Sequence, residues 1–85
     1  MKHIPTKEEN PKGLHQRYVI YKISDFGNFI PTDRGSEYFV MRLDEGGSDR
    51  EHIKACRIGV HAYADAIEHH LPELAKDLRE RYPLL

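Results

Sequence analysis

The side chains best suited to chemistry are histidines and acids in the second half of the chain. His61, Asp65 and His69 recur every four residues, a spacing that puts them on one side of a helix, where imidazole and carboxylate groups can hold a metal ion. Zinc needs four ligands in a fixed tetrahedron, and this row supplies two or three. Its helical phase also places the row on the flank and back of the helix, which water normally reaches. We therefore expect no metal site and no cofactor.

A thiol and an imidazole lie one helical turn apart and are the next candidates. His52 and Cys56, the only cysteine, have the spacing of a nucleophile and its base. Nucleophilic catalysis needs an exposed and readily ionised thiolate. Cys56 falls instead within an apolar stripe, and free cysteine is among the most buried residue types. We expect a small buried hydrophobic side chain at this position.

Two short patterns imitate known motifs. Residues 25–27 read Asp-Phe-Gly, the metal-binding signature of protein kinases, but the glycine-rich loop, the strand lysine and the catalytic loop of that fold are missing. An acid and a glycine around an aromatic residue suit a turn that ends a strand. Gly46 and Gly47 lack the remaining pattern of a phosphate-binding loop. The sequence therefore predicts no catalytic residue, which favours a protein that is not an enzyme.

Length and composition limit the remaining classes. At 85 residues the chain holds one domain, and chains this short bury only about 60% of their unfolded surface. Hydrophobic residues make up 39% of the chain and charged residues 32%, with a formal net charge of −1. Such a chain should fold, and it exerts no general pull on nucleic acid or anionic lipid.

The expected location follows from features that the sequence lacks. A single cysteine cannot form an intramolecular disulfide, and no stretch has the charged start and apolar run of a signal peptide. The apolar runs are far shorter than the ~20 residues that cross a bilayer. We expect a cytoplasmic protein without a membrane partner.

Two runs of β-branched and aromatic residues predict two strands. Residues 1–16 mix polar residues with proline and glycine, which indicates a flexible arm before a folded domain over residues 17–85. The first strand is predicted over residues 18–23 and the second over residues 38–43. The loop between them is expected to cap one edge of the core through three apolar residues, Phe26, Phe29 and Ile30.

Two helices are predicted after the strands. Ser48 and Glu51 have the spacing of a capping box, and a continuous apolar stripe then recurs at three- and four-residue steps. Its members are Ile53, Cys56, Val60, Tyr63, Ala64, Ile67 and Leu71. Pro72 should end this long helix near His70 and occupy the first position of a short second helix. The predicted class is α+β in the order β-β-α-α, a two-stranded antiparallel β unit packed on a long amphipathic helix plus a short C-terminal helix.

The same segments carry a resemblance to a family. The layout resembles that of short uncharacterised bacterial and phage-associated proteins, in which a "YFVLRLD"-like strand precedes a helix containing "YA" and then a "PELAxDL" segment. The matching residues are Lys22, 25–27, 38–44, 62–64 and 71–78. The similarity spans roughly residues 17 to 80, with Met41 in place of the usual leucine and a longer loop between the strands. The resemblance supports the segmentation and implies no site, because that family has no established function.

Side-chain alternation along paired strands then predicts two sheet faces. One face is expected to form a single core with the helix; its ten residues are Val19, Tyr21, Ile23, Phe39, Met41, Leu43, Ile53, Val60, Tyr63 and Ile67. The opposite face is the candidate interface, formed by Tyr18, Ile20, Lys22, Tyr38, Val40 and Arg42. A solvated face should be mainly polar, so something is expected to cover this one.

Three covers for this face are possible, and two of them imply a function. The N-terminal arm or the loop around Phe29 could bury the patch, or a second copy of the chain could do so, which would also pair exposed strand edges. Tyrosines interleaved with Lys22 and Arg42 could instead stack bases and hold phosphates. We predict a non-enzymatic homo-oligomeric interaction or accessory module, most simply a homodimer. A small nucleic-acid-binding protein is the first alternative, and a metal protein or enzyme using the His61, Asp65, His69 row is the second.

Overall fold

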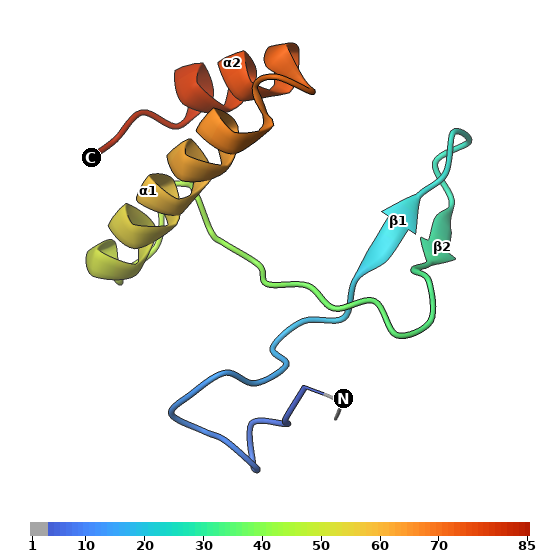
Figure 1. Ribbon diagram of the computed structural model, residues 1–85. Coiled ribbons are helices and arrows are strands. Elements are labelled where there is room, and N and C mark those ends of the chain that lie inside the picture. Colours follow the sequence, from blue (N-terminus) through green and yellow to red (C-terminus); the bar gives the residue numbers. More distant parts are fainter. Residues whose placement is uncertain (1–3) are drawn as a thin grey trace. The chain divides into compact units, whose positions relative to one another are not determined.

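Two short strands and two helices follow one another along the chain. The computed structural model describes residues 4–85, and its elements are β1 (Tyr21–Ile23), β2 (Phe29–Pro31), α1 (Arg50–Ile67) and α2 (Pro72–Arg81) (Figure 1). The predicted α+β class, a two-stranded antiparallel sheet followed by a long and a short helix, is confirmed. The elements fall into two compact units, which divide between Val40 and Met41. In the described part of the chain, neither helix combines the length and the apolar character needed to span a membrane.

The strands form a hairpin with a three-residue loop. Tyr21 pairs with Pro31, and Ile23 pairs with Phe29. Ser24 and Asn28 form the next pair toward the loop, and the amide of Ser24 donates to the carbonyl of Asn28 at 2.9 Å. Gly27 has a φ of +81°, which a residue without a Cβ adopts at little cost, as the last position of such loops requires. The predicted turn at Asp-Phe-Gly is confirmed.

The second strand lies elsewhere than predicted. It covers Phe29–Pro31 rather than residues 38–43, which are extended but belong to no strand, and the first strand begins at Tyr21 rather than at residue 18. A three-residue loop closes the hairpin at a lower entropic cost than the longer connection that the prediction needed. High β-propensity alone does not select a partner, because it reports how side chains fit a pleated surface.

The predicted single core is also wrong. Side chains of the predicted strands that were expected in this core are exposed: Val19 at 75%, Ile23 at 72% and Phe39 at 72%. Tyr21 and Tyr63 are exposed as well, at 56% and 46%. The assignment depended on a strand pair that does not form, so its parity rule does not apply. Among residues 4–85, the buried apolar side chains all belong to the helical unit and are Ile53, Cys56, Val60, Ala64 and Ala75.

The helical unit takes its core from one stripe of α1 and from α2, which folds back beside α1 (Figure 1). Ala64 and Ala75 are fully buried, because alanine lets two helix backbones approach closely. The helix starts one residue later than predicted: Asp49 is the N-cap, and its side chain accepts from the amide of His52 at 3.1 Å. Aspartate caps as well as serine does. α1 ends at Ile67 rather than near His70, where the prediction had placed its end. The amide of Leu71 donates to the carbonyl of Ile67 at 2.8 Å in the turn that follows.

Proline begins the second helix as predicted, and an ion pair lies on its surface. Pro72 occupies its first turn, where the missing N–H has no intrahelical partner to lose. The ammonium of Lys76 lies 3.3 Å from the carboxylate of Glu80. Both side chains are exposed, so this pair contributes little to the free energy of unfolding.

Candidate functional site

The histidine and acid row does not form a metal site. His61 is partly buried, against prediction, and its Nε2 donates to the carbonyl of Tyr82 at 2.6 Å. Asp65 lies 2.7 Å from Nη2 of Arg79, and His69 lies in the turn after α1 has ended. Within residues 4–85, no group of three His, Cys, Asp or Glu side chains could hold a metal ion. Two of the three candidate ligands are therefore committed to structural contacts.

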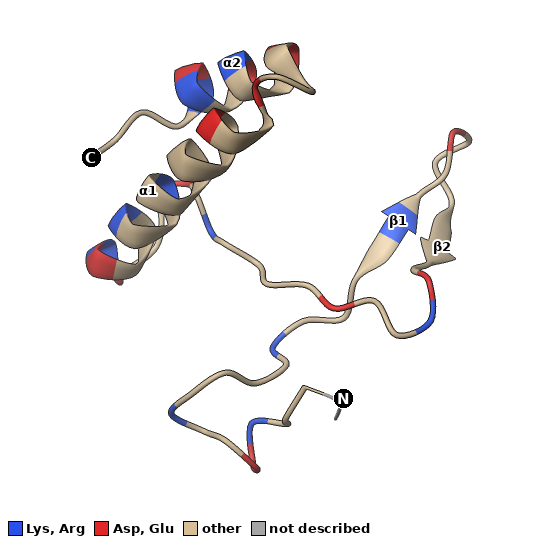
Figure 2. Ribbon diagram, in the orientation of Figure 1, with Lys and Arg blue, Asp and Glu red and all other residues tan. Residues whose placement is uncertain are grey.

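Arg79 joins the two helices electrostatically. It donates to Asp65 and to Glu68, and these two hydrogen bonds raise the pKa of Arg79 above its ordinary value. Arg79 belongs to the last turn of α2, and both acids belong to the end of α1 or the turn after it; Figure 2 shows basic and acidic positions on these two neighbouring helices. The cluster is partly exposed, and it orients α2 along α1 rather than forming a binding site.

Arg57 is a buried cation that sequence reasoning missed. It is 5% exposed, and its Nε and Nη1 donate to the carbonyls of Leu43 and Pro83, both at 2.9 Å. Its guanidinium also lies 5.9 Å from the ring centroid of Tyr82. Arg57 lies four residues after Ile53 on the apolar stripe, and this phase was the signal for its burial. Because its hydrogen bonds hold the segment before α1 and the C-terminal segment, its role is structural.

The thiol is closed to solvent. Cys56 is 4% exposed, and its Sγ lies 3.6 Å from Nε2 of His52. The predicted buried hydrophobic role of Cys56 is confirmed. A buried thiol offers no accessible nucleophile.

The predicted interface residues do not share one sheet face. Of these residues, Lys22 lies in a strand, whereas Tyr38 and Val40 are exposed at 48% and 38% on an extended segment. Tyr18 is exposed at 49%, and Ile20 is partly buried. The participation of these residues in association stays a prediction, but the face that was to unite them is not formed.

Arg42, the remaining predicted interface residue, has a local partner. Its Nε donates to Asp44 at 2.7 Å, and the amide of Gly46 donates to the same carboxylate at 3.0 Å. The bond from Arg42, followed by the bond from Gly46, lowers the pKa of Asp44 from 3.8 to about 2. This arrangement steadies the turn before α1.

The observed hairpin has an exposed apolar face of its own. Its register places four residues on the same side of the sheet, and we call these the hairpin apolar face: Tyr21, Ile23, Phe29 and Pro31. Ile23 and Phe29 are 72% and 78% exposed, and Phe26 at the tip of the loop is 92% exposed. Lys22 and Ile30 occupy the other side. Large apolar patches of this kind typically mark interaction surfaces.

The two edges of the hairpin differ in hydrogen-bonding capacity. Paired positions alternate between hydrogen-bonded and non-hydrogen-bonded in an antiparallel ladder. Since the amide of Ser24 bonds to Asn28, the amides and carbonyls of Tyr21 and Ile23 point to the outer edge of β1. The outer edge of β2 carries Pro31, which has no N–H to donate. The edge of β1 is therefore the better able to accept another strand.

Comparisons with family models, with curated proteins and with solved structures found no match. The resemblance to short bacterial and phage-associated proteins therefore stays a prediction.

Proposed function

We propose that this protein is an interaction module that binds a second copy of itself through the hairpin apolar face and the free edge of β1. The observation that carries the proposal is the exposure of Ile23 and Phe29, 72% and 78%, side by side on one face. An isolated two-stranded hairpin is marginally stable in water. A partner that covers this face stabilises the hairpin and removes the apolar patch from solvent together.

A second copy has the right properties to be that partner. The formal net charge of −1 produces little repulsion between copies. The chain also contains an extended and exposed apolar segment, Tyr38 to Val40, whose backbone makes no hydrogen bond with the described residues. This segment has the β-propensity of a strand and lacks one to pair with. The edge of β1 supplies that strand, and a two-fold axis makes the exchange reciprocal.

Charge selects one arrangement of the two copies. Pairing β1 with β1 of the other copy about Lys22 would set two ammonium groups opposite each other, which is destabilising. Antiparallel pairing that sets Tyr21 opposite Tyr38 brings Lys22 opposite Glu37 instead. Val40 then lies opposite Val19 and extends the hairpin apolar face. We therefore assign residues 36–40 of the second copy to the edge of β1.

The proposal is tested by the molar mass in solution. Light scattering coupled to gel filtration should give a dimer for the parent chain and a monomer for Ile23→Lys, because the new charge is desolvated in the interface. Ile58→Lys is the matched control, since Ile58 is 55% exposed on α1, and this variant should remain dimeric. A parent chain that is monomeric at high micromolar concentration, or equal loss of dimer in both variants, would refute the proposal.

Charge exchange tests the assigned register. Lys22→Glu and Glu37→Lys should each weaken the dimer, and the double variant should restore it, since cross-strand pairs of opposite charge contribute about 0.2–1 kcal/mol. If the dissociation constant of the dimer is the same in the parent and in all three variants, the chain still associates with itself, but this register is excluded. Sedimentation equilibrium measures the dissociation constant of each variant and so tests this register.

A further inference from the structure

Residues 5–16 form a closed loop. The amide of Gln16 donates to the carbonyl of Pro5 at 2.9 Å, and we call residues 5–16 the N-terminal loop. Thr6 and Glu9 exchange side chain to backbone hydrogen bonds of 2.8 and 3.2 Å. The side-chain amide of Asn10 donates to the carbonyl of Leu14 at 3.0 Å. A loop of this length, with its ends joined and its interior held by its own side chains, is an Ω-loop, a type that is frequently functional.

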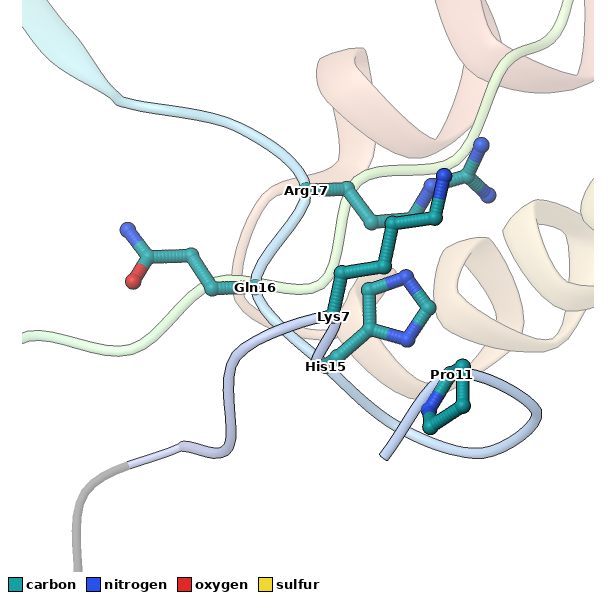
Figure 3. A pocket seen from close by; sticks show the side chains of 5 residues that line it. All are labelled: Lys7, Pro11, His15, Gln16 and Arg17. Atoms are coloured by element: carbon teal, nitrogen blue, oxygen red, sulfur yellow. The ribbon is translucent and has the colours of Figure 1, made fainter. Parts of the chain in front are cut away.

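A basic hollow opens on this loop. A cavity of about 470 Å³ is lined by Lys7, Pro11, His15, Gln16 and Arg17. Figure 3 shows the side chains of Lys7 and Arg17 extending in the same direction, next to the ring of His15, while Gln16 points the other way. None of these five lining residues is acidic. The cavity therefore presents two basic side chains to a ligand.

The ring of His15 is fixed by the loop. Its Nδ1 lies 2.9 Å from the carbonyl of Asn10 and 3.0 Å from the carbonyl of Gly13. Carbonyl oxygens only accept, so Nδ1 carries the proton and donates. In the neutral ring, Nε2 is then left with a lone pair that accepts a hydrogen bond. The loop thus holds one acceptor beside two cations.

We infer that this cavity binds the phosphate monoester group of a small molecule. The guanidinium of Arg17 and the ammonium of Lys7 are the groups that proteins use to hold phosphate oxygens. A phosphate monoester carries between one and two negative charges at neutral pH, because its second pKa is near 6, and two cations balance that charge. The fraction that keeps a proton donates it to Nε2 of His15. A carboxylate or a sulfate has no such proton to donate at that pH.

The volume of the hollow is also sufficient for a small molecule. Small-molecule sites typically measure about 300–1,000 Å³, and this one measures about 470 Å³. A phosphate group fills only part of that volume, which leaves room for the remainder of a ligand against the ring of Pro11. The site is separate from the hairpin surface, and it stands whether or not the chain associates with itself.

An NMR titration of the full chain tests this assignment. Inorganic phosphate and ribose 5-phosphate should shift the imidazole resonances of His15 and the Nε resonance of Arg17 in a saturable manner, and sulfate at equal ionic strength should not. Lys7→Ala and Arg17→Ala should each weaken binding about tenfold or more, as expected for a lost hydrogen bond to a charged group. Lys12→Ala is the matched control, because Lys12 is exposed on the same loop but does not line the cavity.

Three results would overturn the inference. One is the absence of saturable shifts at His15 in a chain whose helical resonances are intact. Another is an equal response to sulfate, or an equal loss in Lys12→Ala, since either would indicate general charge attraction. The last is tighter binding of a single-stranded oligonucleotide than of ribose 5-phosphate at the same residues, which would assign the site to nucleic acid.

Discussion

Different interactions stabilise each of the two units of this protein internally. From Met41 to Leu85 a stripe of α1 packs on α2, and the buried side chains lie in this unit. From residue 4 to Val40 no described residue is buried, and order comes from a three-residue hairpin loop and from polar hydrogen bonds. The difference indicates that the helical unit supplies stability on its own, while the first unit supplies surfaces and needs partners to cover them.

The largest expected effect comes from truncating the same residue type in each unit. Ile53→Ala should lower the free energy of unfolding by about 2–5 kcal/mol, because it leaves a cavity in the core. Ile23→Ala should change the stability of a monomeric chain by only about 0.5 kcal/mol, as surface substitutions do. Urea unfolding followed by circular dichroism measures both substitutions, at a protein concentration low enough for the parent chain to be monomeric by light scattering. Equal losses would show that the hairpin has a core after all.

A smaller effect is expected for the buried arginine. Arg57→Met keeps most of the volume but removes the donors to Leu43 and Pro83, and an unsatisfied buried group costs about 1–3 kcal/mol. Arg50→Met, an exposed position in the first turn of α1, should have almost no effect. The same unfolding experiment measures both. A stable Arg57→Met variant would mean that the segments flanking the helices need no anchor.

The hairpin loop should be sensitive at one glycine. Gly27 has a φ of +81°, and a Cβ in that conformation costs about 1–2 kcal/mol. Gly27→Ala should therefore weaken the hairpin and the dimer while leaving helical circular dichroism unchanged, and Gly27→Asn should be milder, because asparagine tolerates this conformation. Loss of helical signal in Gly27→Ala would contradict the independence of the two units.

The smallest expected effect is the change in stability at low pH. The pKa of Asp44 is lowered from 3.8 to about 2, so its pairing with Arg42 stabilises the fold above about pH 4 and is lost as the pH falls toward 2. In Arg42→Ala the pKa of Asp44 should return toward its ordinary value, which carboxyl NMR titration measures directly. Lys76→Ala serves as a control that should leave this pKa unchanged. Since the pair is exposed, added salt should shrink the effect.

Features with a local cause were predictable from the sequence. The apolar period gave the stripe of α1 and the burial of Cys56, and Pro72 gave the start of α2. The Asp-Phe-Gly turn followed from the glycine at its last position. Each depends on residues within a few positions of one another, where spacing determines geometry.

Features with a distant cause were not predictable. The second strand lies at residues 29–31 rather than 38–43 because the shorter connecting loop costs less entropy to close. Since the strand was placed wrongly, the predicted sheet faces and the predicted core were wrong as well. The bonds of Arg57 join residues 14 and 26 positions apart. The N-terminal loop is held by side chain to backbone bonds that leave no hydrophobic period. Of these features, only the burial of Arg57 had a signal in the sequence, which was its position on the apolar stripe.

Contact between copies tests the central claim most directly. In an equimolar mixture of isotope-labelled and unlabelled chains, filtered nuclear Overhauser spectra report only contacts between molecules. We expect such contacts between Ile23 or Tyr21 of one copy and residues 36–40 of the other. Finding instead that Ile23 and Phe29 contact only residues of their own chain would contradict the proposal that a second copy covers the hairpin.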